Sequence, residues 1–161
     1  METMVTAKQG ERADIAGLGT RYLLRGEQTG GRFALLEHTI RPRGLAAPMH
    51  VHEREDEYSF VLAGRMGARV GDVEVEAGPG DLVAKPRGIP HAFWNPGDDE
   101  TRLLELISPA GFESYFAELA PLLAGGGPPD LDALAELQAR YALQMDMSTV
   151  DSLVERHGLQ M

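Results

Sequence analysis

Short alternating segments dominate the first two thirds of the chain. Apolar and polar residues alternate through residues 73–77, and a period of two is typical of a half-buried strand. The Gly71-Asp72 pair just before this segment is a strong hairpin signal. Other segments rich in β-forming residues end at glycine or proline and predict strands at 21–24, 33–40, 58–62, 66–70, 82–84, 91–94 and 102–107. So many short strands predict an all-β sandwich or barrel, which we place at residues 16–108.

The pattern changes to a helical one after residue 108. Apolar residues recur at helical spacing through residues 112–123. Asp130 is the expected N-cap of a second helix that runs to about Leu143. A third helix is expected at residues 150–157, stopped by a glycine. We therefore expect residues 109–161 to form a helical extension packed on the barrel, and a functional lid or a dimer arm is the alternative.

Composition narrows the classes of partner. The 19 glycines and 10 prolines suit a fold with many tight turns. The net charge of −10 repels phosphate backbones and anionic lipid, so we expect neither nucleic acid nor a membrane as partner and look to a small molecule. The chain has no cysteine, which excludes disulfides, thiolate ligands and a cysteine nucleophile. Any metal must be held by nitrogen and oxygen.

The beginning of the chain carries no clear pattern. Residues 1–15 are expected to be an N-terminal segment that is flexible at least in part. Residues 1–12 are polar and lack the apolar run of a signal peptide. No stretch approaches the roughly 20 apolar residues of a membrane span. These features predict a cytoplasmic protein.

Three histidines and one carboxylate are the candidate metal ligands. His50 and His52 are two residues apart, and on a strand this spacing puts both rings on one face. A turn within the acidic run 53–57 would let Glu57 face the same way, and His91 lies on a later predicted strand. Three imidazole nitrogens and one carboxylate oxygen suit one divalent Fe, Ni, Mn, Co, Cu or Zn ion. Such a set leaves positions open for a substrate, as catalytic metal sites do.

Each of these features also has a plain structural interpretation. A His-x-His pair in an acidic segment is often a solvated loop, and an acidic run is usually a wet turn. His91, beside two aromatic residues, can simply be a half-buried barrel residue. Glu53 and Glu55 are alternative ligands if the turn is placed differently.

Glycines and a proline around the candidate ligands follow two spaced patterns. From Gly44 the chain reads G-x5-H-x-H-x4-E-x6-G, and from Gly80 it reads G-x5-P-x-G-x2-H-x3-N, ending at Asn95. These patterns resemble both signature motifs of the cupin superfamily at every defining position. The resemblance covers residues 44–95 and implies a double-stranded β-helix, or jelly-roll, barrel that forms a homodimer. It also implies that the metal ligands are His50, His52, Glu57 and His91.

Strand alternation predicts which residues line a pocket around the metal. Residues that share a face with the ligands on their own strands are expected to point inward with them. The expected walls beside the ligands are Pro48, Ser59, Val61 and Phe93, and Phe33 and Leu35 are expected on the far side. The strand at 102–107 is expected to add either Leu104 and Leu106 or Leu103 and Ile107. These walls are mostly apolar and suit an aromatic or hydrophobic small molecule. Lys85 and Arg87 are expected near the mouth.

The chain as a whole resembles bacterial single-domain cupins of the quercetin-dioxygenase-like group, and residues 107–113 resemble the tail of that group. The resemblance implies a metal-dependent dioxygenase acting on a small aromatic or enolic substrate, with Glu57 serving as ligand and then as base. One alternative is a non-catalytic cupin that binds or senses a ligand. Another is a different metal-dependent enzyme, such as an isomerase, lyase or hydrolase, because one fold hosts many functions.

Overall fold

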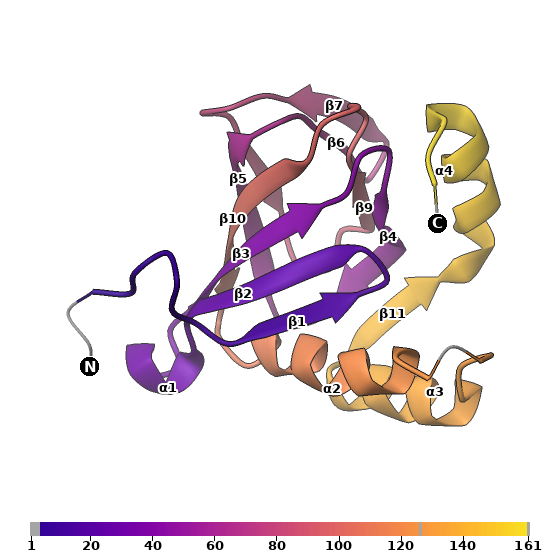
Figure 1. Cartoon of the computed structure of the whole chain (residues 1–161). Coiled ribbons are helices and arrows are strands. Elements are labelled where there is room, and N and C mark those ends of the chain that lie inside the picture. The colour runs from indigo at the N-terminus through magenta and orange to yellow at the C-terminus, as the bar shows by residue number, and fades with distance from the viewer. Residues whose placement is uncertain (1–3, 126, 161) are drawn as a thin grey trace.

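Two antiparallel β-sheets face each other in the computed structural model, which describes residues 4–125 and 127–160 (Figure 1). The first sheet contains, in spatial order, β1 (Arg12–Ile15), β2 (Leu18–Leu24), β3 (Ala34–Ile40), β10 (Thr101–Ser108), β5 (Asp56–Ala63) and β8 (Leu82–Lys85). The second contains β11 (Leu143–Asp146), β4 (Leu45–His52), β9 (His91–Trp94), β6 (Met66–Val70) and β7 (Val73–Ala77). The predicted all-β architecture is confirmed.

The space between the sheets holds the core. Burial alternates strictly along β10, the strand between β3 and β5, so Leu103 and Ile107 point inward and are fully buried. Leu103 packs in one cluster with Ile40, Val61 and Met66, which come from strands of both sheets. Fully burying one such side chain stabilises the fold by about 1.5–3 kcal/mol. This shared cluster therefore holds the two sheets together.

Two glycines allow close approaches that the barrel requires. Gly64, between β5 and β6, has φ = 74°, and a Cβ there would lie 2.7 Å from the Thr101 hydroxyl oxygen. Gly67, in β6, lies against Trp94, whose Nε1 would be 2.2 Å from an added Cβ. A side chain at Gly64 would collide with the backbone at Glu100 and Thr101, and one at Gly67 would collide with the Trp94 ring.

Within residues 4–125 and 127–160 the helices are α1 (Gly26–Thr29), α2 (Glu113–Leu123), α3 (Leu131–Arg140) and α4 (Val150–His157). The Asp130 carboxylate accepts hydrogen bonds from the backbone N–H groups of Asp132 and Ala133, so the expected N-cap of α3 is confirmed. Helix α4 has the expected bounds and ends at Gly158 with φ = 62°. A 3₁₀ turn (Met147–Thr149) precedes it.

Strand β11 is an element that the sequence did not predict. Helix α3 ends at Arg140 rather than near Leu143, and residues 143–146 pair antiparallel with β4. Residues 143–146 alternate apolar and polar, but the helical pattern expected to reach Leu143 covered the start of this segment, and the strand forms because the free edge of β4 supplies a partner. The chain then continues into α4, which lies along the outside of the second sheet (Figure 1).

Parts of two expected segments fall outside the described residues, namely residues 1–3 of the N-terminal segment and residues 126 and 161 of the C-terminal extension. Within the N-terminal segment, β1 pairs with β2 from residue 12 onward. The domain boundaries expected at 16 and 109 stay a prediction. Among the helices of the described residues, none has the length and apolar character that crossing a bilayer requires.

Candidate metal centre and cavity

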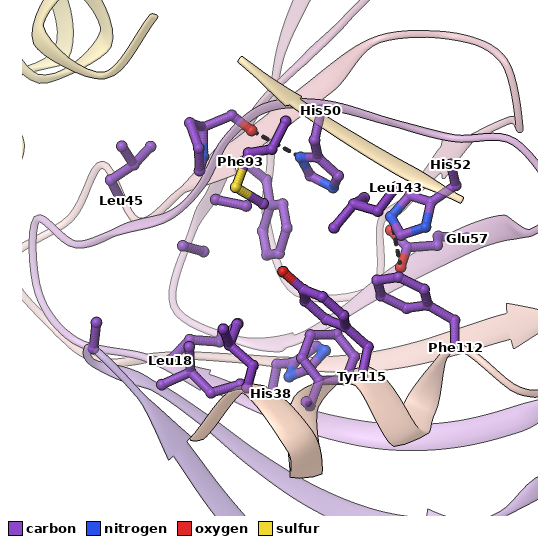
Figure 2. Close-up of a pocket in the computed structure, with 18 of the residues that line it drawn as sticks. Leu18, His38, Leu45, His50, His52, Glu57, Phe93, Phe112, Tyr115 and Leu143 are labelled. Atoms are coloured by element: carbon purple, nitrogen blue, oxygen red, sulfur yellow. Dashed lines mark hydrogen bonds and ion pairs between the residues drawn. The ribbon is translucent and has the colours of Figure 1, made fainter. Parts of the chain in front are cut away.

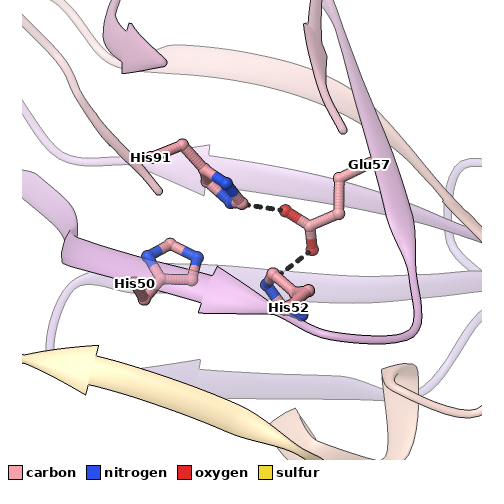
Figure 3. A group of neighbouring side chains, drawn as sticks. All are labelled: His50, His52, Glu57 and His91. Carbon is pink, nitrogen blue, oxygen red and sulfur yellow. Dashed lines mark ion pairs between the residues drawn. The ribbon is translucent and has the colours of Figure 1, made fainter. Parts of the chain in front are cut away.

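Four side chains from three strands meet between the sheets (Figure 3). His50 and His52 lie on β4, Glu57 lies at the start of β5, and His91 begins β9. The β4–β9 ladder places His50 directly opposite His91. Each of the four buried residues offers one ligand atom, and these atoms all lie within 4.8 Å of one another. The structure thus brings together the residues that the sequence singled out.

Backbone hydrogen bonds join the two spaced motifs and fix this arrangement. The N–H of Gly88 donates to the carbonyl oxygen of His52 at 2.8 Å, and the N–H of Asn95 donates to the carbonyl oxygen of Gly44 at 2.9 Å. The Asn95 side chain also donates to the carbonyl oxygen of Asp99 at 2.7 Å, which closes the loop after β9. The glycines and the asparagine therefore hold the ligand-bearing strands in register.

Backbone carbonyls set the protonation of two imidazole rings. Nδ1 of His50 lies 2.7 Å from the carbonyl oxygen of Pro48, and Nδ1 of His91 lies 3.1 Å from that of Ile89. A carbonyl oxygen only accepts, so each Nδ1 donates and each Nε2 keeps a lone pair. Nε2 of His91 is buried and has no hydrogen-bond partner among the residues that the structure describes, and it lies 3.3 Å from Oε2 of Glu57. Nε2 of His91 and Oε2 of Glu57 are thus two buried acceptors that face each other, and a cation bound to both would satisfy them.

The electrostatics of the group give the charge states that metal ligands need. Burial holds the pKa of His50 well below its usual value, and it lowers the pKa of His91 as well. Burial alone would raise the pKa of Glu57, but the ammonium of Lys85 holds it well below the usual range. The group therefore offers neutral imidazoles at His50 and His91 and an ionised carboxylate at neutral pH.

The separations also fit a bound ion. Ligand atoms about 2.1 Å from one ion lie roughly 3–4 Å apart. Nε2 of His52 lies 3.6 Å from Oε1 of Glu57, and Nε2 of His91 lies 3.3 Å from Oε2 of the same carboxylate. The cluster can thus bind a divalent metal, and its nitrogen and oxygen donors are compatible with several ions.

The alternative carboxylates lie outside this group. Oε2 of Glu55 lies 3.8 Å from Nδ1 of His52, the ring nitrogen that does not face Glu57. Glu53 is exposed and accepts a hydrogen bond from the Gln144 side chain at 2.6 Å. Because β5 begins at residue 56, Glu57 is the member of the acidic run 53–57 whose side chain points between the sheets.

A cavity of about 300 Å³ opens beside the cluster. Figure 2 shows His50, His52 and Glu57 on one side of this cavity and Leu18 and His38 on the opposite side. Most of the remaining wall is apolar and includes Ile15, Leu45, Pro48, Phe93, Phe112, Phe116, Leu119, Leu143 and Met145. Pro48 and Phe93 are among the residues that the sequence placed there.

Four expected wall residues lie elsewhere, and this part of the expectation is corrected. Phe33, Leu35, Leu104 and Leu106 do not line the cavity. Leu35, Leu104 and Leu106 point to the outer faces of β3 and β10, because the inward residues of those strands are the even-numbered residues 34–40 and the odd-numbered residues 101–107. Phe33 immediately precedes β3. Both strands are apolar on both faces near these positions, so the sequence did not fix which face turned inward.

Ser59 and Val61 point inward on β5 as expected, but they pack in the interior and do not line the cavity. The hydroxyl of Ser59 donates to Oε2 of Glu105 at 2.6 Å. Val61 packs in the cluster that holds the sheets together.

The sequence analysis did not assign three polar residues, Lys85, Glu105 and His38, to the cavity wall. Lys85 was expected near the mouth, but its side chain is 1% exposed and lies between Glu57 and Glu105. His38 also lines the cavity, and its Nδ1 lies 3.0 Å from the hydroxyl of Thr20. The signal for each was the period of two along its strand, because Lys85, Glu105 and His38 share a face with buried apolar neighbours.

The C-terminal extension supplies another part of the wall that the sequence did not assign. The ring centroid of Phe112 lies 4.2 Å from that of His52. In the β11–β4 ladder, Leu143 lies opposite His52 and Met145 lies opposite His50. The extension thus packs on the barrel and also closes the cavity beside the candidate ligands. No local pattern could show this, because these contacts join residues about 60 to 95 positions apart in the chain.

Comparisons with known proteins place this geometry in a family context. The family described as "Cupin domain" matches residues 36–107. The curated protein TcmJ, a tetracenomycin polyketide synthase protein of Streptomyces glaucescens, is 29% identical over 93 residues, which is 58% of this chain and 62% of TcmJ. The match therefore spans less than two thirds of that relative's length.

Solved structures share the barrel. The polyketide cyclase RemF of Streptomyces resistomycificus is 30% identical with a TM-score of 0.57, and the match covers 67% of this chain and 80% of RemF. An RmlC-like cupin of Shewanella frigidimarina is 20% identical with a TM-score of 0.58, covering 71% of this chain and 96% of that protein. The second likeness concerns the fold alone.

Proposed function

This chain belongs to the cupin superfamily and has its fold, and from that premise we propose that it is a metal-dependent enzyme acting on a small, enolisable molecule related to aromatic polyketides. The observation that carries the proposal is the apolar cavity of about 300 Å³ that opens onto His50, His52 and Glu57. Such a cavity suits a flat hydrophobic ligand with a few oxygen atoms. The names of TcmJ and RemF, both tied to polyketides, support this substrate class.

The reaction that we propose is ring closure in which the carbon next to one carbonyl of the substrate, as an enolate, forms a bond to the carbon of a second carbonyl. The C=O π bond of that second carbonyl breaks, its oxygen takes up a proton, and the resulting hydroxyl group leaves as water. A divalent metal held by the four ligands would supply Lewis acidity to an enolate oxygen. Glu57, ligand and base in this proposal, would accept the proton released as the enolate forms. Phe93, Phe112 and Phe116 would hold a flexible substrate in a folded, planar arrangement and exclude water from it.

The dioxygenase predicted from the sequence is the second candidate. The same donor set, three imidazoles and one carboxylate, leaves room for two further oxygen ligands, and the same apolar cavity suits a flavonol-like substrate. A cupin that only binds or senses such a ligand is the third. The three candidates differ in their consumption of oxygen and in whether the ligand is changed.

One experiment separates these candidates. The protein is loaded with Fe, Ni, Mn, Co, Cu or Zn and incubated with a linear poly-β-ketone, a flavonol and a catechol, while an oxygen electrode and mass spectrometry follow each reaction. We expect the poly-β-ketone to lose water and cyclise without oxygen uptake, and Glu57→Gln to abolish the reaction. Oxygen uptake with the flavonol would favour the dioxygenase, and unchanged ligand that binds in calorimetry would favour a sensor. A poly-β-ketone that neither binds nor reacts with any of the metal-loaded forms would contradict the proposal.

The homodimer implied by the cupin resemblance stays a prediction. Strands β7 and β8 end their sheets, and the exposed side chains Val73, Val75 and Leu82 lie on them. Free sheet edges with apolar side chains invite pairing with a second copy. Light scattering is expected to give twice the chain mass, with Val73→Lys shifting the protein toward monomer. A monomeric wild-type protein would contradict this assignment.

A further inference from the structure

A lysine is buried at the metal centre. Nζ of Lys85 lies 3.0 Å from Oε2 of Glu57 and 3.0 Å from Oε1 of Glu105, and its side chain is 1% exposed. The same nitrogen lies 4.4 Å from the centroid of the Phe93 ring. Lysine is almost never fully buried unless it is paired. Two carboxylates and an aromatic face therefore hold this ammonium group beside a candidate metal ligand.

The lysine is also anchored by Glu105, a carboxylate outside the set of candidate ligands. Glu105 lies on β10, directly opposite Ser59 of β5, and its Oε2 accepts the Ser59 hydroxyl at 2.6 Å. Its other oxygen faces Lys85. Both Glu105 and Ser59 are buried. The resulting chain, Ser59–Glu105–Lys85–Glu57, fixes the position of the ammonium group independently of any metal.

We propose that Lys85 is the internal counter-ion of the metal centre, which balances Glu57 in the metal-free protein and weakens the binding of the divalent ion. The inference rests on the proposed metal-dependent function and deepens it. A buried carboxylate without a partner is costly, and a metal ion and Lys85 can each provide the compensating positive charge. When both are present, the two cations repel each other across the Glu57 carboxylate.

Removing the ammonium therefore has opposite effects on the two states of the protein. The metal-free protein loses the cation that both Glu57 and Glu105 face and becomes less stable. The metal-bound protein loses a like charge beside the ion, so binding becomes tighter. Lys85→Met makes this change with an unbranched apolar side chain that fills much of the same space.

The experiment measures Zn²⁺ binding by calorimetry and thermal unfolding with and without Zn²⁺, at one pH, for the wild type and Lys85→Met. We expect a lower Tm for the metal-free variant, a larger Tm increase on adding Zn²⁺, and a Kd at least about tenfold lower. The matched control is Arg87→Met, which removes an exposed cation paired with Asp56 at 2.7 Å. The control is expected to keep the wild-type Kd and the wild-type shift on adding Zn²⁺.

The outcomes separate this inference from the proposed function. An unchanged or higher Kd in Lys85→Met, with normal binding by the wild type, would overturn the counter-ion role alone. Absence of Zn²⁺, Co²⁺, Ni²⁺, Mn²⁺, Fe²⁺ and Cu²⁺ binding by the wild type would overturn the metal-dependent function as well.

A second variant keeps the test decisive if metal-free Lys85→Met fails to fold. The double variant Glu57→Gln/Lys85→Met removes both charges of the pair. We expect the double variant to fold without metal and to unfold cooperatively on heating, because no unpaired carboxylate remains at position 57. A double variant that also fails to fold would show that Lys85 acts by packing and would overturn the inference.

Discussion

Acidification is expected to destabilise the metal-free protein through one buried histidine. His38 lies on the inward face of β3 and is 1% exposed. Burial lowers the pKa of His38 to about 4, and the charge of Lys85 acts in the same direction, whereas Glu57 and the backbone of Gly19 act against it. The folded protein therefore resists the proton that an unfolded chain accepts readily.

The magnitude follows from the difference in pKa between the two states. The pKa of an unfolded-state histidine is about 6.5, and that of His38 in the folded protein is about 4. Above pH 6.5 neither state binds the proton and stability does not depend on this group. Between pH 6.5 and 4 only the unfolded state binds it, so stability falls as the pH falls. The full effect is about 3 kcal/mol, and about 2.5 kcal/mol is reached at pH 4.5.

Urea denaturation measures this loss. The wild type and His38→Gln are unfolded with a metal chelator present at several pH values between 7.5 and 4.5. Glutamine can still hydrogen-bond to the Thr20 hydroxyl, which lies 3.0 Å from Nδ1 of His38, but it does not titrate. The wild type is expected to lose about 2.5 kcal/mol more than the variant over this range. Parallel losses within about 0.5 kcal/mol would refute the assignment of a buried, neutral His38.

Further predictions concern the ligands, one close contact and one helix cap. Elemental analysis of protein purified without added metal is expected to give about one metal per chain, lost in His50→Ala and His91→Ala; full retention in both would contradict the ligand assignment. Gly67→Ala is expected to lower the free energy of unfolding in urea by about 3 kcal/mol, because its Cβ would lie 2.2 Å from Nε1 of Trp94; a loss below about 1 kcal/mol would show that the ring moves away easily. Asp130→Ala, which removes the N-cap of α3, is expected to cost about 1 kcal/mol in the same assay, and an unchanged midpoint would mean that water caps the helix equally well.

The candidate ligands could be found from the sequence because local rules position them. The pair His50 and His52 shares a strand face through a period of two, and the glycine and proline spacing around Glu57 and His91 has the cupin pattern. The N-cap Asp130 and the stop of α4 at Gly158 are local in the same sense. Turn geometry and side-chain alternation act over a few residues, so a linear pattern contains them.

Local patterns along the chain were therefore enough to predict the class of fold, the positions of most strands and the four candidate metal ligands. Folding set which face of β3 and β10 turned inward, placed Lys85 between two carboxylates, and brought β11 against β4 to close the cavity. These features depend on pairing between strands far apart in the chain and on the burial of charge among groups that only folding brings together. A strand that is apolar on both faces, or a lysine at a strand end, has no preferred environment until its partners are in place.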